Sequence, residues 1–424
     1  MSNKYKKMIC LLLALPFIVS CSFFDKSNEM VVNSPTHPTS AYPDPFLPSG
    51  SADCSNHSND NDQKRIELPF YLEKEIKDTI FDIQEFCGDD AFHSIAFFSD
   101  LHVYDYDDHQ FNSLVDCLAY LETIYNIDCV INLGDNVNEQ VSRKNHVSNS
   151  IISEYIYIVN HYLKETIQSP FFSINGNHDG IGCDFFDLAF WNAFTDMDDS
   201  FNTAYREQNK PYFYFDISNH YRLVFLSTPS GSDLNSLTVN WCFGREQLDW
   251  LSKIALDTPN DYSVLIFTHV PFLFEDKSNE SIVCWDGQHK CVVASGELNG
   301  RLDDKEEFIS ILDSYQNHKK TGSYDFSNKE RTAVLCCVSG HVHYDSLIYN
   351  TSDSFLPCPL ITIGSNKYGT DGRSWENIPN QSSYRERTMR TSDEVLFDIA
   401  VFNKDAFATF RVGAGDDRVV FDNR

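Results

Sequence analysis

The sequence is poor in positive charge. Lys and Arg contribute 33 residues against 62 Asp and Glu residues, which gives a formal net charge of −29 at pH 7. A surface of this sign repels nucleic-acid phosphates, so the composition argues against a nucleic-acid-binding protein. A phosphorylated small molecule is still an acceptable ligand if bound cations reverse the local field.

The sequence also contains no CxxC pair and no internal repeat, and its N-terminal apolar run is short. That run, Met8–Val19, has 12 residues, whereas a membrane-spanning helix needs about 20. Without a CxxC pair, a zinc knuckle has no support. The composition is otherwise globular, because 42% of the 424 residues are hydrophobic. Such a chain can bury one large core and still carry extensions.

The first residues have the layout of a signal peptide. Lys4, Lys6 and Lys7 precede the apolar run, and a basic region before a hydrophobic one is typical of export signals. Ile18-Val-Ser-Cys21 resembles a bacterial lipoprotein box. We therefore expect residues 1–20 to be a signal peptide and Cys21 to carry a lipid. The protein would then be anchored outside the cytoplasm, at the cell membrane or cell surface. The alternative is an ordinary secreted protein in which Cys21 has no special role.

Composition divides the rest of the chain. Residues 21–63 are rich in Ser, Pro, Asn and Asp, cannot bury a core, and are expected to form a disordered tether. Residues 64–424 are expected to fold. Of the 13 cysteines, 11 remain after Cys10 and Cys21, and an odd number cannot all pair. Cys284 and Cys291 are the best disulfide candidates of an exported protein. Buried free thiols are expected at three strand positions, Cys129, Cys336 and Cys337.

Apolar segments of strand length recur along the folded region, and each is followed within a few residues by Asp, Asn or His. The segments are residues 95–99, 129–133, 171–174, 264–268 and 334–338. The polar residues after them are Asp100, His102, Asp135, Asn177, His269, His341 and His343. Extended alternation would place Asp100 and His102 on the same side of their segment.

The segments between these strands predict an α/β fold. Helical spacing at residues 111–125 separates the first two strands, so a strand–helix–strand unit with parallel strands is expected. A hairpin at residues 212–226 adds antiparallel pairing, and strands at 395–402 and 406–412 predict a second hairpin. Parallel strands keep their sites beyond their carboxyl ends, so the polar residues should meet at one edge.

A shared metal centre explains these polar residues better than separate roles do. A single strand-end Asp can cap a helix, and a single His can be a satisfied core residue. Several such groups buried at one edge without partners would each cost about 1–3 kcal/mol. Nitrogen and oxygen ligands without thiolate suit Mn, Fe, Zn or Ni over Ca. Our hypothesis is that Asp135 bridges two cations.

In order and spacing, these motifs resemble those of the calcineurin-like metallophosphoesterases, a superfamily that includes purple acid phosphatases and cyclic-nucleotide phosphodiesterases. The matching blocks are Asp100-Leu-His102, Gly134-Asp135, Gly176-Asn-His-Asp179, His269 and Gly340-His-Val-His343. They span a motif core of about 95–345, which leaves 354–424 as a C-terminal β extension. One departure is Asn138, where the family often has an acid, but in the family that position is not a metal ligand.

The resemblance implies a fold and a ligand set. The fold is a four-layer α/β/β/α metallophosphoesterase sandwich with two mixed β-sheets. One of two divalent or trivalent metal ions would be held by Asp100, His102 and His343. The other would be held by Asn177, His269 and His341, and Asp135 would bridge the two.

The implied activity is hydrolysis of phosphoester bonds, with a hydroxide bridging the two metals as nucleophile. His178 would stabilise the transition state or protonate the leaving group, and Asp179 would orient its ring. The substrate would be a small phosphorylated molecule, with monoester, diester and pyrophosphate all open. An alternative is a catalytically inactive surface lipoprotein that binds a ligand or partner.

Other parts of the chain have weaker expectations. The loops 195–210, 230–243 and 272–301 are expected to form the rim of the site, where Trp241, Phe243 and Trp285 either stack on substrate or pack beneath the loops. The basic segment 367–392 either reaches substrate phosphate or is solvated; we expect the second. Its arginines are Arg373, Arg385, Arg387 and Arg390. The segment Gly413–Arg418 looks like tails of other bacterial members, and no role is predicted for it.

Overall fold

A computed structural model describes residues 67–103, 109–137, 149–180, 204–206, 210–228, 243–272, 274–276, 281–283, 304–343, 345–349, 356–367 and 387–424. All of them belong to one unit of the chain, Ser58–Arg424. The predicted signal peptide, the lipid site Cys21 and the Cys284–Cys291 pair lie outside the described residues.

The first large sheet has six strands in the order β17-β16-β15-β1-β2-β3. Their bounds are β1 His93–Phe98, β2 Cys129–Asn132, β3 Phe171–Ser173, β15 Leu396–Phe402, β16 Ala406–Gly413 and β17 Arg418–Asp422. β1, β2 and β3 pair in parallel, as the strand–helix–strand pattern predicts, whereas β15 pairs with β1 antiparallel. The C-terminal hairpin is thus hydrogen-bonded into the same sheet as the first motif strand.

The second large sheet has seven strands in the order β13-β14-β12-β7-β6-β5-β4. Their bounds are β4 Tyr205–Arg206, β5 Phe213–Ser218, β6 Tyr221–Leu226, β7 Ser263–Thr268, β12 Ala333–Ser339, β13 Ser346–Ile348 and β14 Leu360–Thr362. β6, β7, β12 and β14 run parallel. The antiparallel pairs β5–β6 and β13–β14 make this sheet mixed too. Two small two-stranded sheets add β8 Phe274–Asp276 with β9 Ser281–Val283, and β10 Lys320–Thr321 with β11 Tyr324–Asp325.

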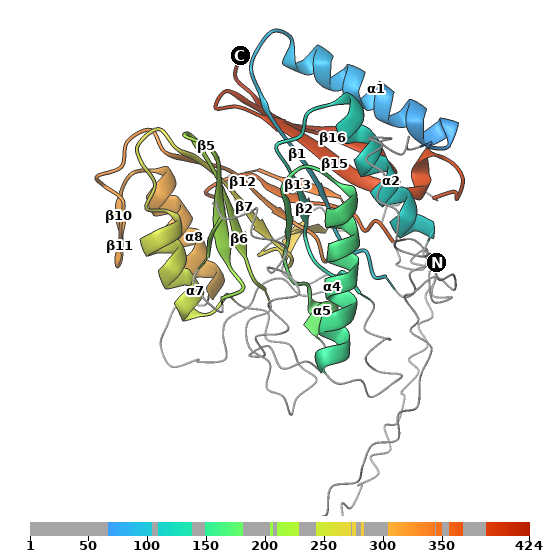
Figure 1. The fold of residues 1–424 in the computed structure, drawn as a ribbon. Coiled ribbons are helices and arrows are strands. Elements are labelled where there is room, and N and C mark those ends of the chain that lie inside the picture. Colours follow the sequence, from blue (N-terminus) through green and yellow to red (C-terminus); the bar gives the residue numbers. More distant parts are fainter. Residues whose placement is uncertain are drawn as a thin grey trace, which may run out of the picture. The chain divides into compact units, whose positions relative to one another are not determined.

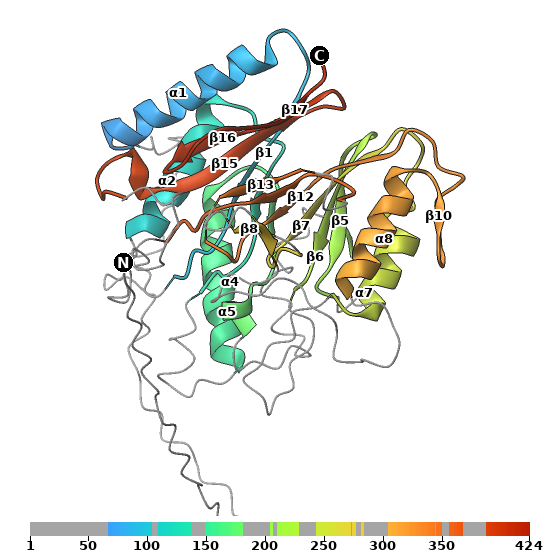
Figure 2. The same ribbon diagram turned by 180° about the vertical axis from the view of Figure 1, so that it is seen from behind.

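Helices cover the outer face of each large sheet (Figures 1 and 2). α1 Phe70–Cys87, α2 His109–Ile124 and α4 Asn149–Thr166 lie over the first sheet. α7 Arg245–Trp250, the π-helical turn η2 Leu251–Ala255 and α8 Asp304–Gln316 lie over the second. Two further short helices lie within the described ranges, α5 Asn177–Gly180 and the 3-10 turn η4 Ser392–Glu394. No helix among the described residues is both long enough and apolar enough to cross a membrane.

Side chains alternate along each strand between the face that packs on helices and the face that packs on the other sheet. In β1, Ala96 and Phe98 face the helices, whereas Ile95 and Phe97 face the other sheet, because successive side chains of a strand point to opposite faces. The space between the sheets is filled by aliphatic and aromatic side chains from both, including Phe225. The described core is therefore an α/β/β/α sandwich with two mixed sheets, and the predicted fold class is confirmed.

Candidate metal centre

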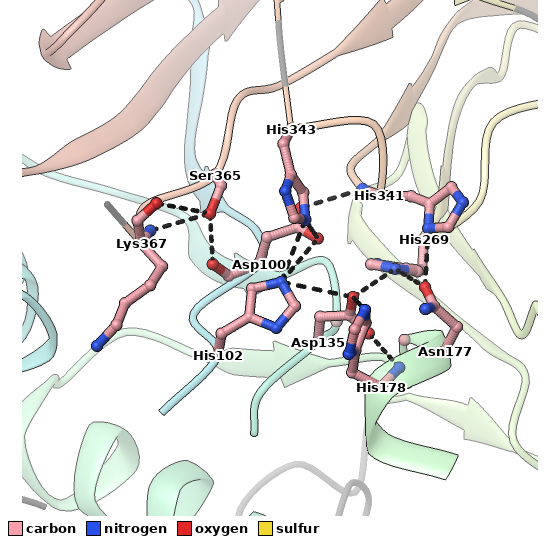
Figure 3. A network of polar contacts seen from close by, with 12 residues as sticks. Asp100, His102, Asp135, Asn177, His178, His269, His341, His343, Ser365 and Lys367 are labelled. Carbon is pink, nitrogen blue, oxygen red and sulfur yellow. Dashed lines mark hydrogen bonds and ion pairs between the residues drawn. The ribbon is translucent and has the colours of Figure 1, made fainter. Parts of the chain in front are cut away.

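The carboxyl ends of five strands from both sheets meet at one place (Figure 3). Asp100 and His102 follow β1, Asp135 follows β2, Asn177 and His178 open α5 after β3, His269 follows β7, and His341 and His343 follow β12. All seven predicted ligands are at most 6% exposed. The structure thus brings together residues that lie as much as 243 positions apart in the sequence, from Asp100 to His343.

The polar side chains form two groups that share one carboxylate. In each group, the potential ligand atoms lie within 4.8 Å of one another: Asp100, His102, Asp135 and His343 in the first, and Asp135, His269 and His341 in the second. Asn177 joins the second group, because its Oδ1 lies 3.0 Å from His269 Nε2 and 2.8 Å from His341 Nδ1. Asp135 therefore has the position that a bridging ligand requires.

Two buried carboxylate oxygens at the centre of the cluster show whether the site suits cations. Oδ1 of Asp100 and Oδ2 of Asp135 are buried and accept no hydrogen bond from any residue that the structure describes. The nearest imidazole nitrogens are His343 Nε2, at 3.1 Å from the first, and His269 Nε2, at 3.3 Å from the second. Burying a carboxylate oxygen in this way is costly, and a cation would remove the cost. Carboxylate, amide and imidazole ligands without thiolate suit first-row transition metals.

The backbone at the site is not extended, which corrects the reasoning from the sequence. Five of the seven residues have positive φ angles: Asp100 (55°), His102 (44°), Asp135 (54°), His341 (70°) and His343 (61°). Asp100 and His102 converge because of this left-handed backbone and not by strand alternation. Such conformations cost about 1–3 kcal/mol each and persist only where surrounding contacts enforce them. The site is therefore strained, and its loops need support.

Two motif glycines are required because the loops approach each other closely. A Cβ atom added to Gly176 would lie 2.0 Å from Oδ1 of Asp135, and one added to Gly340 would lie 1.8 Å from Oγ of Ser99. Neither contact is sterically possible, so only glycine allows the strand ends to meet.

The electrostatics of Asp100, Asp135 and His102 favour the forms that bind metals. Burial alone would raise the pKa of Asp135, but His269 and His178 outweigh it and hold that pKa well below its usual range. The pKa of Asp100 falls to about 2 against the same effect of burial, mainly through His343. Burial and the neighbouring His178 lower the pKa of His102 well below its usual value. Ionised carboxylates and a neutral imidazole are the protonation states of metal ligands.

The carboxylates also create a negative field at His269. Burial would lower the pKa of this imidazole, yet Asp135 and Asp100 raise it to about 9. Its Nδ1 lies 2.8 Å from the carbonyl oxygen of Leu133. A carbonyl can only accept, so Nδ1 donates and Nε2 faces Asp135 and Asn177. The field at this point attracts positive charge, as a cation site requires.

His178 differs from the ligand candidates in its exposure. Its side chain is 22% exposed, compared with 5% for His102 and 2% for His343. Its Nε2 lies 3.9 Å from Oδ2 of Asp135, and its ring packs edge-on against His102 at a centroid distance of 4.6 Å. His178 therefore lies beside the cluster and keeps one side open to solvent.

Three hydrogen bonds of Asp179 join two loops of the site, and its predicted role in orienting the His178 ring stays a prediction. Its oxygens accept hydrogen bonds from the amide nitrogens of Gly176 and Val137 and from Nδ2 of Asn136, at 2.8–3.1 Å. These contacts join the loop after β2 to the loop after β3, and none of them orients the His178 ring. Burial and the charge of Asp135 raise the pKa of Asp179 to about 7.

Sequence reasoning missed several supporting residues. Ser365, which follows β14, donates a hydrogen bond of 2.8 Å to the carbonyl oxygen of Asp100. Asn136, the residue after Asp135, accepts a hydrogen bond of 2.6 Å from Nδ2 of Asn132. The sequence contained a signal for Ser365 and for Asn132. Ser365 follows a sixth apolar strand, and Asn132 is a polar residue within an otherwise apolar strand.

The structure describes only part of the expected rim and of the basic segment, and the predictions for the described residues agree with it only in part. Most of the three rim loops, with Trp241 and Trp285, lies outside the described residues, whereas Phe243 is 1% exposed and packs in the core under α7 and α8. The solvated role was wrong for Arg387, which is buried and donates to the carbonyl oxygens of Ser365, Asp393 and Glu394. Arg373 and Arg385 lie in a part of the chain that the structure does not describe.

Comparisons with solved structures show similarity over 78% of this chain. A dimetal phosphatase from Danio rerio has 16% identity, 98% coverage of its own chain and a TM-score of 0.47. PhoD has 12% identity, 72% coverage and a TM-score of 0.42. GAP50, the anchor in the inner membrane complex of Plasmodium, has 11% identity, 90% coverage and a TM-score of 0.42. No curated protein matches the sequence.

The family comparison covers the motif core. The model of the calcineurin-like phosphoesterases matches residues 93–345, which include every strand end of the cluster and more than half of the chain. With the sandwich fold and the paired Asp and His groups, this match supports a metal-dependent phosphoesterase. The chain belongs to the calcineurin-like phosphoesterase family.

Proposed function

We propose that this protein hydrolyses a small phosphorylated substrate at a dinuclear metal centre. Asp100, His102 and His343 would hold one cation, and Asn177, His269 and His341 the other. Asp135 would bind both. The observation that carries the proposal is the presence of Asp135 in both groups of ligand atoms. Mn, Fe, Zn and Ni all suit the donor set.

Two bound cations would supply what phosphoester hydrolysis needs. When bound, such a pair neutralises phosphoryl oxygens and lowers the pKa of a coordinated water that serves as the nucleophile. The chain's own contribution is to fix the ligands through the strained strand ends and to exclude bulk water from their buried side.

His178 would act on the substrate and not on a metal. Its partial exposure and its position beside the cluster leave its ring able to meet a bound phosphoester. A proton held on Nε2 can stabilise the transition state or pass to the leaving alkoxide. Asp179 would support this residue indirectly, by keeping the loop after β3 against the loop after β2.

The protein would act outside the cytoplasm, anchored by a lipid on Cys21. The basis is the sequence, with lysines, a short apolar run and Cys21 followed by a polar stretch. Metabolic labelling with a radioactive fatty acid tests it. Label should enter the parent and be absent from Cys21→Ser, and an unlabelled parent would contradict the anchoring.

Activity is tested with a panel of phosphomonoesters, phosphodiesters and pyrophosphates, assayed with added Mn²⁺ or Zn²⁺ and with a chelator. We expect hydrolysis of at least one class, lost on chelation and restored by metal. The alternative, an inactive lipoprotein that binds a ligand, predicts metal uptake without turnover of any class. Turnover that is unchanged by chelation would contradict the dinuclear mechanism.

A further inference from the structure

The C-terminal hairpin carries a buried arginine that reaches the second sheet. Arg411, on β16, has a side chain that is 1% exposed. Its Nη2 and Nη1 donate to the two oxygens of Asp345 at 2.7 and 2.9 Å, and its Nε donates to Asp398 at 2.6 Å. A two-pronged contact of this kind fixes a carboxylate in both position and plane.

A second arginine completes the group. Arg418, on β17, forms an ion pair with Asp398, lies 3.7 Å from Asp345, and donates to the carbonyl oxygen of Thr362 at 2.8 Å. Two arginines and two aspartates therefore balance each other. Arg411 and Asp398 are buried, whereas the side chains of Arg418 and Asp345 are 10% and 21% exposed, and the pairing makes this degree of burial tolerable. We call Arg411, Arg418, Asp345 and Asp398 the arginine clamp.

Asp345 connects the clamp to the first group of ligands. It lies two positions after His343 and directly before β13. Its Oδ1 also accepts from the amide of Gly364 at 3.0 Å. A Cβ atom at Gly364 would lie 3.7 Å from the carbonyl oxygen of His343, so this residue packs against the loop. The next residue, Ser365, holds the carbonyl oxygen of Asp100.

The segment Gly413–Arg418, for which the sequence predicts no role, is built around Arg411. The carbonyl oxygen of Ala414 accepts from its Nη1 at 2.6 Å, and Oδ1 of Asp417 accepts from its backbone amide at 2.8 Å. A Cβ atom at Gly415 would lie 2.0 Å from Nη1 of Arg411. Only glycine leaves room for the guanidinium there.

We propose that the arginine clamp positions the ligands of the first cation, Asp100 and His343, through the carboxylate of Asp345. This inference rests on the proposed metal centre. The positive φ of His343 gives the physical need, since a strained loop keeps its shape only when its ends are held. The C-terminal hairpin would then support the metal site and not only extend the sheet.

The test compares two variants of the same clamp. Asp345→Asn and Asp398→Asn each leave the two arginines with one countercharge in the clamp, so both should lower the unfolding temperature. Of the two aspartates, only Asp345 lies in the loop of His343 and bonds to the amide of Gly364, next to the Ser365 that holds Asp100. Mn²⁺ binding is measured by equilibrium dialysis of the purified protein, below the unfolding transition of each variant recorded by circular dichroism.

We expect Asp345→Asn to lower the affinity for one of the two Mn²⁺ ions about 10–100-fold, the range for partners of metal ligands. The affinity for the other ion should change little. Asp398→Asn should keep both affinities close to those of the parent. Asp345→Glu keeps the charge, which protects folding, and should show an intermediate loss because its longer side chain displaces the contact with Gly364.

Two results would contradict the proposed role of the arginine clamp. One is metal affinity in both Asp345 variants equal to that of the parent, and the other is an equal loss in Asp345→Asn and Asp398→Asn that follows stability alone. The parent itself tests the proposed function separately: two bound ions without hydrolysis of any phosphoester would contradict the activity, and the comparison of variants would still decide the role of Asp345.

Discussion

The backbone amide of His178 donates a hydrogen bond of 2.7 Å to Oδ1 of Asp135. The carboxylate at the end of β2 thereby holds the start of α5, where Asn177 and His178 lie. One oxygen of Asp135 is used for this contact, while the other, Oδ2, faces the imidazoles of His102 and His269. The residue proposed to bind both cations also places the residue proposed to act on the substrate.

Asp135→Asn should remove most activity and leave a folded protein. The amide keeps the size of the side chain and can still accept from His178, but the negative charge that two cations would share is lost. We expect turnover to fall roughly 10²–10³-fold, the cost of removing one strong electrostatic contact from an active site. Assay of a generic phosphoester at saturating Mn²⁺, with circular dichroism as the folding control, checks this. A rate equal to that of the parent would falsify the bridging role.

His178→Ala should retain metal and lose turnover. The ring lies beside the ligands and is not counted among them, so both ions should still bind, while kcat falls by about 10²–10⁴ as for loss of a general acid. The loss should be smaller with a p-nitrophenyl leaving group, which needs no protonation. Metal analysis and kinetics on two leaving groups measure this. His341→Ala serves as the contrast, because it should lose metal; an empty site in His178→Ala would contradict the separation of roles.

Removing metal should lower thermal stability. Ligands that bind the folded state alone stabilise it by about 2.7 kcal/mol at a concentration 100 times the Kd. Mn²⁺ would also neutralise the buried carboxylates of Asp100 and Asp135. Thermal unfolding followed with chelator, with Mn²⁺ and with Ca²⁺ checks the effect. We expect a higher midpoint with Mn²⁺, little change with Ca²⁺, and a smaller Mn²⁺ shift in Asp135→Asn; equal shifts for both ions would argue against a mixed nitrogen and oxygen site.

Lys367→Met should stabilise the protein in a pH-dependent way. Burial lowers the pKa of Lys367 from 10.5 to about 8, so the folded state disfavours its charge. The penalty is complete below pH 8 and disappears as the pH rises from 8 to 10.5, where the unfolded chain also loses the proton. The variant should therefore gain up to about 3 kcal/mol at pH 7. Urea unfolding at pH 7 and pH 10.5 measures this, and a gain that persists at the higher pH would show that charge is not its cause.

Gly415→Ala should destabilise the folded protein far more than Gly322→Ala does. Both glycines have positive φ, 135° and 60°, so both replacements strain the backbone. A Cβ atom at Gly322 meets nothing within 4 Å, whereas one at Gly415 collides with Arg411. We expect a loss of about 1 kcal/mol for Gly322→Ala and about 3 kcal/mol or more for Gly415→Ala, the range for a disrupted buried ion pair. Urea unfolding of the two variants checks the difference, and equal losses would mean that Arg411 can move aside.

The sequence alone identified the strands of the site and the polar residues after them. The apolar segments at β1, β2 and β7, each followed by Asp or His, are local patterns that sheet geometry converts directly into a shared edge. Parallel pairing of β1 with β2 also followed from the helix between them. Such inferences succeed because the apolar pattern of a buried strand is formed by residues that are neighbours in the sequence.

Only the tertiary structure decided how the loops are shaped and supported. The positive φ of Asp100 and His343, the contacts of Asp179, the burial of Arg387 and the pairing of Arg411 with Asp345, 66 positions away, leave no local trace in the sequence. A polar residue that is buried looks the same in the sequence as one that is solvated. Its partner is fixed by strand order in the sheets, because only the packed sandwich brings β16 of one sheet against the start of β13 in the other.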